Sequence, residues 1–433
     1  MAQGLIFYDC KGIQCIFKHK NQALRLNKKK IINDPVYGFI TIPSELIYDI
    51  IAHPYFQRLR HIKQLGLTDL VYPGALHTRF QHALGAMHLM SKALDSLRQK
   101  DIQISQEEYE AAQIAILLHD IGHGPFSHAL EHSLLQGIKH ESLSYLLMSA
   151  LNDEFDGRLE LALRIFRNSY PRKFLHQLVS SQLDIDRLDY LKRDCFFTGV
   201  QEGTIGVDRI ISMLSVYREQ LVVEQKGIYS IENFLTARRL MYWQVYLHKT
   251  TLSAERMLVG IIKRAQTLVQ GGERVTSSAS LQMFLKNSFS IEDFRTNAKA
   301  LKSFGVLDDN DIWGGIKCWR DHHDKILSTL CKMLLERRLF QITLSSDPIK
   351  KQTIEKVRAA VSKHYLTLRA ESNYLFSYGS VSNEAYAEGQ QINIITKQGE
   401  LLDIAQASDL PSIKAFSRIV KKNYLCWPKD VSI

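Results

Sequence analysis

Apolar residues recur every three to four positions through most of the chain, and this period constrains the fold more than any other feature. In segment 44–66, Leu46, Ile47, Ile50 and Ile51 fall on one side of a helix that Gly66 can end. Further segments share the period, at 107–122, 141–151, 159–166, 180–194, 231–266 and 321–340. The chain is therefore expected to be mainly helical up to about residue 335.

The pattern changes towards the C-terminus. Short β-prone pieces such as 374–379 and 392–396 alternate with polar turns there, and one more helix is expected at 347–365. The predicted fold class is mainly α, with a helical core and a smaller C-terminal α+β domain. We expect an N-terminal lead-in with short strands at 1–45, a helical domain at 46–335 and the α+β domain at 336–433.

Length, hydropathy and charge narrow the classes of function. A chain of 433 residues exceeds one ordinary core, so two or three subdomains are expected. No apolar run reaches the roughly 18 residues of a membrane span, which predicts a cytoplasmic protein with no membrane partner. The net charge of +10 favours polyanionic ligands, either nucleotides or a nucleic-acid backbone, and does not distinguish between them.

Half of the sixteen histidines lie between His77 and His140, with the doublet His119-Asp120 at the centre of this stretch. An imidazole nitrogen and a carboxylate oxygen can share one divalent ion. On a continuous helix, neighbouring side chains point about 100° apart. However, the doublet is expected at the C-terminal end of segment 107–122, where the backbone can turn and let the two side chains converge.

A later segment offers a partner for the doublet. In 180–194, Asp186, Tyr190 and Asp194 are spaced four residues apart, so they share one helix face. Asp186 could complete a metal site together with His82 and the doublet, while the ring and the second carboxylate suit a nucleotide above the metal. The alternative at this point is a solvated, salt-bridged helix with Tyr190 in the core.

Six motifs, taken together in order and spacing, carry a family resemblance. They are NDPVYGFITIP, HPYFQRLRHIKQLG, YPGALHTRFQHALG, LLHDIGHGPFSHALE, DIDRLDYLKRD and a run of Arg238, Tyr242 and Tyr246. Over roughly residues 30–345, the chain resembles the HD-domain deoxynucleoside-triphosphate (dNTP) triphosphohydrolases. The resemblance implies one divalent metal ion per subunit, Mn²⁺, Fe²⁺, Zn²⁺ or Mg²⁺, with the ligands His82, His119, Asp120 and Asp186.

The resemblance also implies roles for further residues. The acid/base group would be His123, His128, Glu131 and His140. Basic contacts to the triphosphate would be Arg79, Arg187, Lys192 and Arg238. The sugar would be held by Gln64 and Asp194 and pressed at C2′ by Leu65 and Tyr246, with Tyr190 and Tyr242 completing the substrate site. Two positions depart from the mammalian relative, which has an aspartate in place of Glu131 and a histidine in place of Tyr242.

The leading prediction is metal-dependent hydrolysis of a dNTP to deoxynucleoside and triphosphate, by attack of water on the α-phosphate. Two alternatives stay open: an HD phosphohydrolase acting on another nucleotide phosphoester, and a nucleic-acid-binding or scaffold protein with an inactive site. The resemblance further implies a homo-oligomer, dimer or tetramer. An activating nucleotide would bind at a subunit interface near Gln57, Arg58 and Arg60, where Ala52 replaces an aspartate of the mammalian enzyme; Lys28–Lys30, His322 and His323 could line other anionic pockets.

Overall fold

A computed structural model describes residues 30–131, 133–135, 137–365, 373–383, 391–411, 413 and 420–433. The strands expected before residue 30, with Lys28 and Lys29, lie outside these ranges. The first elements are β1 (Ile31–Asp34) and β2 (Gly38–Thr41), which pair as an antiparallel hairpin. The Asp34 carboxylate accepts hydrogen bonds from the backbone N–H groups of Val36 and Tyr37, and these bonds fix the turn.

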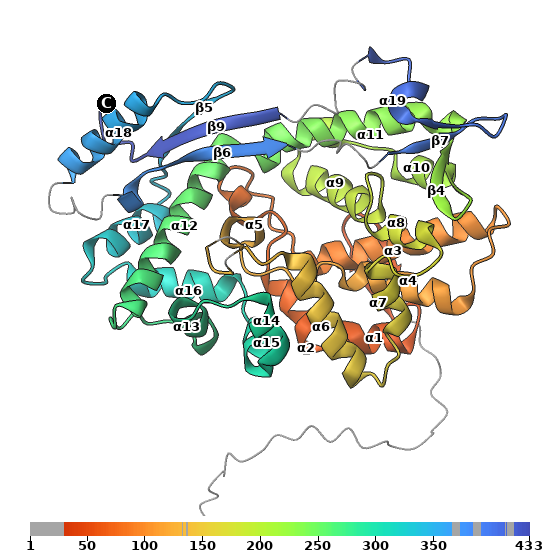
Figure 1. The fold of residues 1–433 in the computed structure, drawn as a ribbon, viewed down its shortest axis with the longest axis horizontal. Coiled ribbons are helices and arrows are strands. Elements are labelled where there is room, and N and C mark those ends of the chain that lie inside the picture. Colours follow the sequence, from red (N-terminus) through yellow and green to blue (C-terminus); the bar gives the residue numbers. More distant parts are fainter. Residues whose placement is uncertain are drawn as a thin grey trace, which may run out of the picture.

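The central helix of the main bundle is α3 (Arg79–Arg98), which is largely buried and packs against α4 (Gln106–Leu118) and α9 (Ile185–Thr198) (Figure 1). The helices that complete this bundle are α6 (His140–Glu154), α7 (Glu160–Phe166), α8 (Lys173–Val179), α10 (Val207–Met213) and α11 (Ile228–Met241). The short helix α5 (Ser127–Leu130) lies between α4 and α6 in the chain. This architecture confirms the mainly α fold class.

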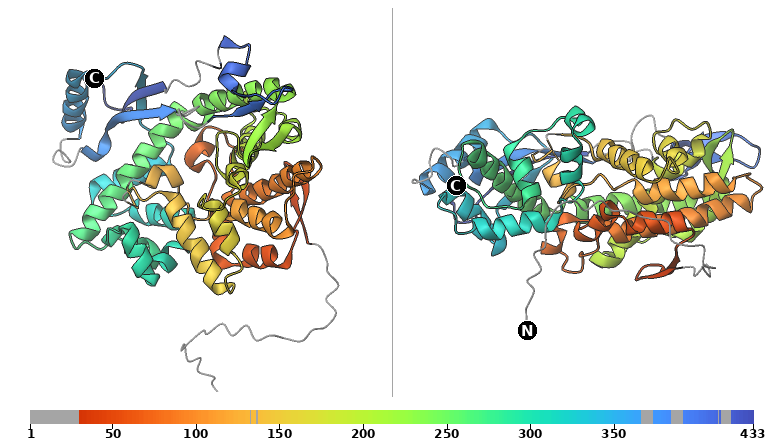
Figure 2. Two further views of the ribbon diagram at one scale, coloured as in Figure 1. Left: turned by 45° about the vertical axis from the view of Figure 1, so that its right-hand side comes forward. Right: turned by 90° about the horizontal axis from the view of Figure 1, so that it is seen from below.

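A second group of helices gathers around the long helix α12 (Lys249–Gln270), beside the main bundle in both views of Figure 2. Helix α12 packs on α13 (Ala279–Lys286) and α17 (Lys325–Leu335). The remaining members are α14 (Ile291–Thr296), α15 (Ala298–Phe304) and α16 (Asp309–Trp319). Phe284, Phe294 and Phe304 are fully buried and their rings contact one another, which joins α13, α14 and α15 in one core.

Two segments that were expected to be continuous helices are interrupted. Segment 44–66 forms α1 (Glu45–Ala52), then α2 (Pro54–Gln57), and then 3₁₀ turns at Arg58–His61 and Gly66–Leu70. The reason is Pro54, which has no N–H to continue the first helix but fits the first position of the next. Segment 231–266 is divided between α11 and α12 by a π-helical turn at Tyr242–Tyr246, a feature often found at functional sites.

The C-terminal residues form two small sheets. In the first, β9 (Val420–Trp427) lies between β5 (Gln341–Ser345) and β6 (Ser377–Asn383), all antiparallel, and α18 (Lys351–His364) packs nearby. In the second, β7 (Asn393–Ile395) pairs with β8 (Leu401–Asp403), which leads into α19 (Ile404–Ala407). Strand β7 also pairs in parallel with β4 (Gln220–Glu224), the partner of β3 (Leu214–Tyr217).

The C-terminal part therefore adds strands to a hairpin of the helical body. The expected division at residue 335 stays a prediction. One sheet contains strands from both sides of that residue. None of the helices in the described part of the chain has both the length and the hydropathy needed to cross a bilayer.

We predict opposite effects for two glycine-to-alanine substitutions within helices. A Cβ at Gly85 would lie 2.1 Å from both the Arg193 guanidinium and the Asp189 carboxylate, whereas a Cβ at Gly314 meets nothing within 4 Å. Gly85→Ala should lower the free energy of unfolding by about 1–3 kcal/mol, since overpacking outweighs the better helix propensity of alanine. Gly314→Ala, the control, should raise it by up to about 1 kcal/mol. Urea titrations followed by circular dichroism would measure both, and a stabilised Gly85→Ala variant would contradict the packing described.

Candidate active site

The helix that carries Asp186 begins at a strong N-terminal cap. The Asp184 carboxylate accepts hydrogen bonds from the backbone N–H groups of Arg187 (2.7 Å) and Ser181 (2.8 Å). This cap places Asp186 in the first turn of α9, and Tyr190 and Asp194 follow on the same face.

The doublet lies where α4 ends. His119 caps the helix and its carbonyl accepts a hydrogen bond from the Ser144 hydroxyl of α6, which in turn accepts from the Gly122 N–H. A Cβ at Gly122 would lie 2.1 Å from the backbone nitrogen of Ser144. Glycine is therefore required for α6 to approach the turn, and this approach holds His119 and Asp120 at the end of the helix.

Three of the predicted metal ligands, His82, His119 and Asp186, form one group whose ligand atoms all lie within 4.8 Å of one another, and Asp120 lies beside it in a second group with His123 and His140. Asp186 Oδ1 lies 3.1 Å from His82 Nε2 and 3.4 Å from His119 Nε2. Asp120 contributes Oδ1, 3.3 Å from His119 Nε2, and Oδ2, 3.8 Å from His82 Nε2. Ligand atoms held about 2.0–2.2 Å from one ion lie roughly 3 Å from each other, so these separations suit a shared divalent cation.

Both imidazoles are oriented with Nε2 towards the cluster. His82 Nδ1 lies 2.7 Å from Asp189 Oδ2, and His119 Nδ1 lies 2.6 Å from the Ile116 carbonyl oxygen. Both Nε2 atoms are buried and have no hydrogen bond of ordinary geometry to any described residue. If each Nδ1 donates a proton to its oxygen partner, each Nε2 presents a lone pair, as a metal-binding histidine requires.

The electrostatics of the cluster also favour a cation. Burial alone would lower the pKa of His82, but Asp186 and Asp189 outweigh it and raise this pKa to about 10. Burial likewise opposes ionisation of Asp186, yet His119 and His82 hold the pKa of this carboxyl below its ordinary value. Two imidazole nitrogens and two carboxylates in a negative field are a donor set that fits a divalent transition metal or Mg²⁺.

Behind His82 lies a buried ionic network that sequence reasoning did not identify. The Arg193 guanidinium donates hydrogen bonds to Asp189 at 2.9 and 3.0 Å and to Asp34 of the N-terminal hairpin at 2.7 Å. Burial works against ionisation of Asp189, but Arg193 and His82 lower its pKa to about 2. The four-residue spacing of Asp189 and Arg193 was a detectable signal, since it puts them on one face of the helix that carries Asp186.

The predicted acid/base residues surround the other side of Asp120. His123 Nε2 lies 3.3 Å from Asp120 Oδ1, and the His123 ring stacks on His140 with the centroids 3.8 Å apart. Burial, Arg79 and His140 lower the pKa of His123 well below its ordinary value. Glu131 Oε2 lies 3.8 Å from His140 Nδ1. The side chain of His128 lies outside the described part of the structure.

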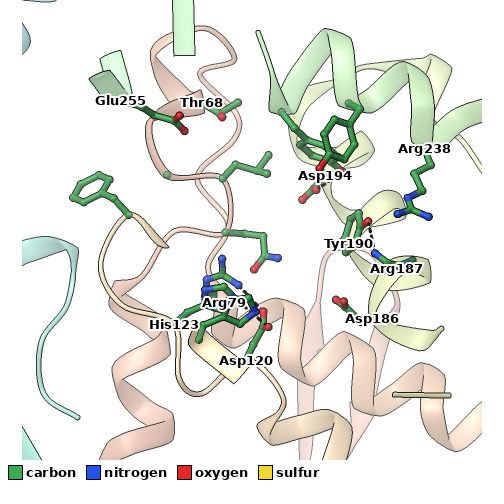
Figure 3. A pocket seen from close by; sticks show the side chains of 17 residues that line it. Thr68, Arg79, Asp120, His123, Asp186, Arg187, Tyr190, Asp194, Arg238 and Glu255 are labelled. Carbon is green, nitrogen blue, oxygen red and sulfur yellow. Dashed lines mark hydrogen bonds and ion pairs between the residues drawn. The ribbon is translucent and has the colours of Figure 1, made fainter. Parts of the chain in front are cut away.

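A cavity of about 330 Å³ opens beside these groups, and Figure 3 shows Asp120 and Asp186 on opposite walls of it. Nine of the predicted substrate residues line the cavity: Gln64, Leu65, Arg79, Arg187, Tyr190, Asp194, Arg238, Tyr242 and Tyr246. Lys192 does not, because its ammonium lies over the Tyr37 ring, 4.6 Å from the centroid. Lining residues that were not predicted include Thr68, Phe126 and Glu255.

Two of the sugar residues predicted by resemblance, Asp194 and Tyr246, are in direct contact, and Gln64 and Leu65 line the same cavity. Tyr246 Oη donates a hydrogen bond to Asp194 Oδ2 at 2.8 Å, and the other oxygen of Asp194 lies 2.7 Å from His77 Nε2. His77 itself was not predicted, although it lies in the motif that supplies Arg79 and His82. The half-buried Leu65 side chain packs against the core and lines the same cavity.

The residues expected to hold an activating nucleotide are engaged within the chain. The buried Arg58 guanidinium donates hydrogen bonds to the carbonyls of Leu307 and Ile121 at 2.9 and 2.6 Å. Gln57 donates to the Ile51 carbonyl and accepts from Arg60. An activator site at these residues stays a prediction, and Arg58 would reach it only by giving up two internal hydrogen bonds.

Comparison with known proteins agrees with this geometry. Residues 79–194 match the HD domain and residues 205–283 match the HD associated region. An uncharacterized Bacillus subtilis protein, YwfO, is 30% identical over 94% of both chains. A SAMHD1 homolog of Dictyostelium discoideum, named a deoxynucleoside triphosphate triphosphohydrolase, is 32% identical over 56% of this chain, which spans only 50% of that relative.

Two solved structures resemble the whole molecule. A Bacteroides thetaiotaomicron phosphohydrolase is 52% identical over 93% of this chain and all of its own, with a TM-score of 0.89. A hypothetical protein of Aquifex aeolicus is 26% identical over 93% of this chain and 97% of its own, with a TM-score of 0.69. The arrangement of the two helical groups is therefore shared with these proteins.

We predict that Asp189→Asn weakens metal binding without unfolding the protein. The amide has no charge and only one acceptor oxygen, and its NH2 group would face a donor of Arg193 where Asp189 Oδ1 now accepts, so the side chain shifts and His82 loses its fixed orientation, while Arg193 keeps Asp34. The affinity for Mn²⁺ should fall by roughly ten- to a hundredfold, as for other residues that support metal ligands. Calorimetric titration of metal-stripped protein would measure this change. Asp208→Asn, which removes an exposed partner of Lys92, is the control; equal affinities in both variants would argue against the orienting role.

Proposed function

The chain belongs to the HD-domain phosphohydrolases, and from that membership we propose that it is a metal-dependent dNTP triphosphohydrolase. The observation that carries the proposal is the composition of one cavity. It is lined by two of the proposed metal ligands, Asp120 and Asp186, by three arginines, and by Leu65 and Tyr246. A triphosphate requires cationic partners, and the apolar face of a deoxyribose suits the wall that Leu65 and Tyr246 contribute. The homologues named as dNTP triphosphohydrolases support this substrate class.

His82, His119, Asp120 and Asp186 would hold one divalent cation, with Mn²⁺, Fe²⁺, Zn²⁺ and Mg²⁺ all compatible with the donor set. When bound, such an ion supplies polarisation of the α-phosphate and a water of lowered pKa. The chain supplies what orients this chemistry: Asp189 and the Ile116 carbonyl fix the imidazoles, and Arg79 donates to Asp120 Oδ2 at 2.5 Å.

Arg79, Arg187 and Arg238 would bind the triphosphate from three sides. Each guanidinium already donates at least one hydrogen bond within the chain: Arg79 to Asp120, Arg187 to the Ser181 carbonyl and the Tyr190 hydroxyl, and Arg238 to Gln182. These bonds restrict the side chains before substrate arrives, so less conformational entropy is lost on binding. Planar guanidinium groups suit phosphate oxygens because they donate two parallel hydrogen bonds.

Release of triphosphate leaves an alkoxide on the 5′-oxygen, which must take a proton. The group made by His123, His140 and Glu131, together with His128, would donate it, because it borders Asp120 and the cavity. Leu65 and Tyr246 would form the wall at C2′, and the Tyr246 hydroxyl already donates its proton to Asp194. We further propose that the protein works as a homo-oligomer.

The bond that is broken tests the proposal directly. We expect metal-loaded protein to convert a dNTP into deoxynucleoside and intact tripolyphosphate in one step, because the metal cluster and the acid group lie together at the α-phosphate end of the cavity. Chromatography of the products at low conversion is the measurement. Release of dNDP and orthophosphate first would refute the mechanism. Cleavage of nucleoside monophosphates but not of any dNTP would favour the alternative, an HD phosphohydrolase of another phosphoester.

Substrates with matched sugars test the wall at C2′. A ribose 2′-hydroxyl there would be crowded and without a partner, a loss on the order of 1–3 kcal/mol that corresponds to roughly ten- to hundredfold discrimination. The ratio of kcat/KM for a dNTP and its NTP should therefore be high in wild type and shrink in Leu65→Ala. Leu76→Ala, an exposed leucine outside the cavity, should leave the ratio unchanged. Equal wild-type values for both sugars would rule out steric exclusion.

A further inference from the structure

Glu255 is an acidic side chain in the cavity that none of the proposed steps uses. It lies near the start of α12, between buried neighbours such as Ala254 and Met257, and lines the cavity with Thr68. In Figure 3 the two residues lie at the end of the cavity away from Asp120 and Asp186. Helix α12 and the 3₁₀ turn that carries Thr68 pack against each other, so the two side chains belong to one surface.

Within the described part of the chain, Glu255 has one long ion pair and no hydrogen bond, and the Thr68 hydroxyl has no hydrogen bond either. The nearest charge to Glu255 is Arg256, with Nη2 3.9 Å from Oε2, which is too far for a hydrogen bond. Neither the Glu255 carboxyl nor the Thr68 hydroxyl makes a side-chain hydrogen bond to any described residue. Burial raises the pKa of Glu255 to about 7, although Arg256 acts against this shift. A carboxyl group kept in a cavity at this cost, without a protein partner, is positioned for a ligand.

The position of this pair follows from the sugar site. Thr68 comes one 3₁₀ turn after Leu65, so the two side chains share a face of that turn. Glu255 comes from the helix that follows Tyr246. Leu65 and Tyr246 are the residues proposed to press on the sugar, and they line the same cavity as Thr68 and Glu255, which Figure 3 shows at the end away from Asp120 and Asp186. A nucleotide with its phosphates among the arginines would therefore extend its base to this end.

We propose that Glu255, assisted by Thr68, is a specificity-determining residue that recognises the Watson–Crick edge of the base and favours guanine. The inference rests on the proposed dNTP substrate and adds to it the choice of base. A carboxylate presents two acceptor oxygens side by side. Guanine offers two adjacent donors, N1–H and the 2-amino group, whereas adenine and cytosine offer one amino group beside an acceptor. Thymine offers one N–H between two carbonyls, which a carboxylate would repel.

The test compares dGTP with dITP, which differs only by lacking the 2-amino group. In wild type, kcat/KM for dGTP should exceed that for dITP by roughly tenfold or more, since one hydrogen bond to a charged acceptor is lost. In Glu255→Gln, which keeps the size and removes one acceptor, the ratio should fall to about one. Thr68→Val should lower the dGTP rate by a smaller factor, and Glu355→Gln on the exposed face of α18 serves as the matched control.

A binding measurement separates this inference from the proposed activity. Calorimetry with metal-loaded protein and 5′-methylene analogues of dGTP and dITP, which lack the leaving oxygen, reports base recognition without hydrolysis. Tighter binding of the guanine analogue to wild type, lost in Glu255→Gln, supports the role of Glu255 even if no dNTP is cleaved. Equal binding of the two analogues to wild type, or a guanine preference that Glu255→Gln retains, overturns it, whatever the hydrolysis assay shows.

Discussion

Three buried aspartates and the partly buried Asp186 determine much of the architecture, because carboxylates removed from water must be compensated. Asp120 and Asp186 border the metal site, while Asp189 and Asp34 lie behind it. Arg193 and Arg79 provide fixed positive charge, and a bound divalent cation would provide the rest. An uncompensated buried charge destabilises a protein by several kcal/mol. The N-terminal hairpin, α3, α4 and α9 therefore have to meet at one point, and glycines at positions 85 and 122 permit the close approach.

The cavity next to this charged centre has a lining whose residues differ in charge and polarity. Figure 3 shows Arg79 and His123 beside Asp120, with Thr68 and Glu255 at the end away from Asp120 and Asp186, and Leu65 and Tyr246 add partly apolar surface to the same lining. A nucleoside triphosphate also combines three kinds of surface: anionic phosphates, an apolar sugar face and a base edge with directional hydrogen bonds. Each part of such a ligand would be held by a different interaction. Binding in one position is then favoured over binding shifted along the cavity.

The sequence predicted those features that depend on local pattern or on short motifs. Helical period was enough for the mainly α fold, and the spacing of Asp186, Tyr190 and Asp194 was enough to place them on one face. The helical period did not predict local interruptions. Pro54 divides the first expected helix, and a π-helical turn at Tyr242–Tyr246 divides another. Lys192 belongs to a motif that supplies other site residues, but its ammonium lies over the Tyr37 ring. A helix that carries several charged residues cannot present all of them to one cavity.

The residues that sequence reasoning did not find share one property. His77, Asp189, Arg193, Thr68 and Glu255 each meet at least one partner that is distant in the chain, so a local spacing, such as the four residues between Asp189 and Arg193, shows at most part of their role. Glu255 is the clearest case: within α12 it differs little from any glutamate of an amphipathic helix. Only the packing of α12 on the turn after Leu65 gives its carboxyl a place in the cavity. The metal ligands come from the main bundle and this acid from the neighbouring helical group. A substitution on α12 could therefore alter the choice of substrate while leaving the geometry of the metal site intact.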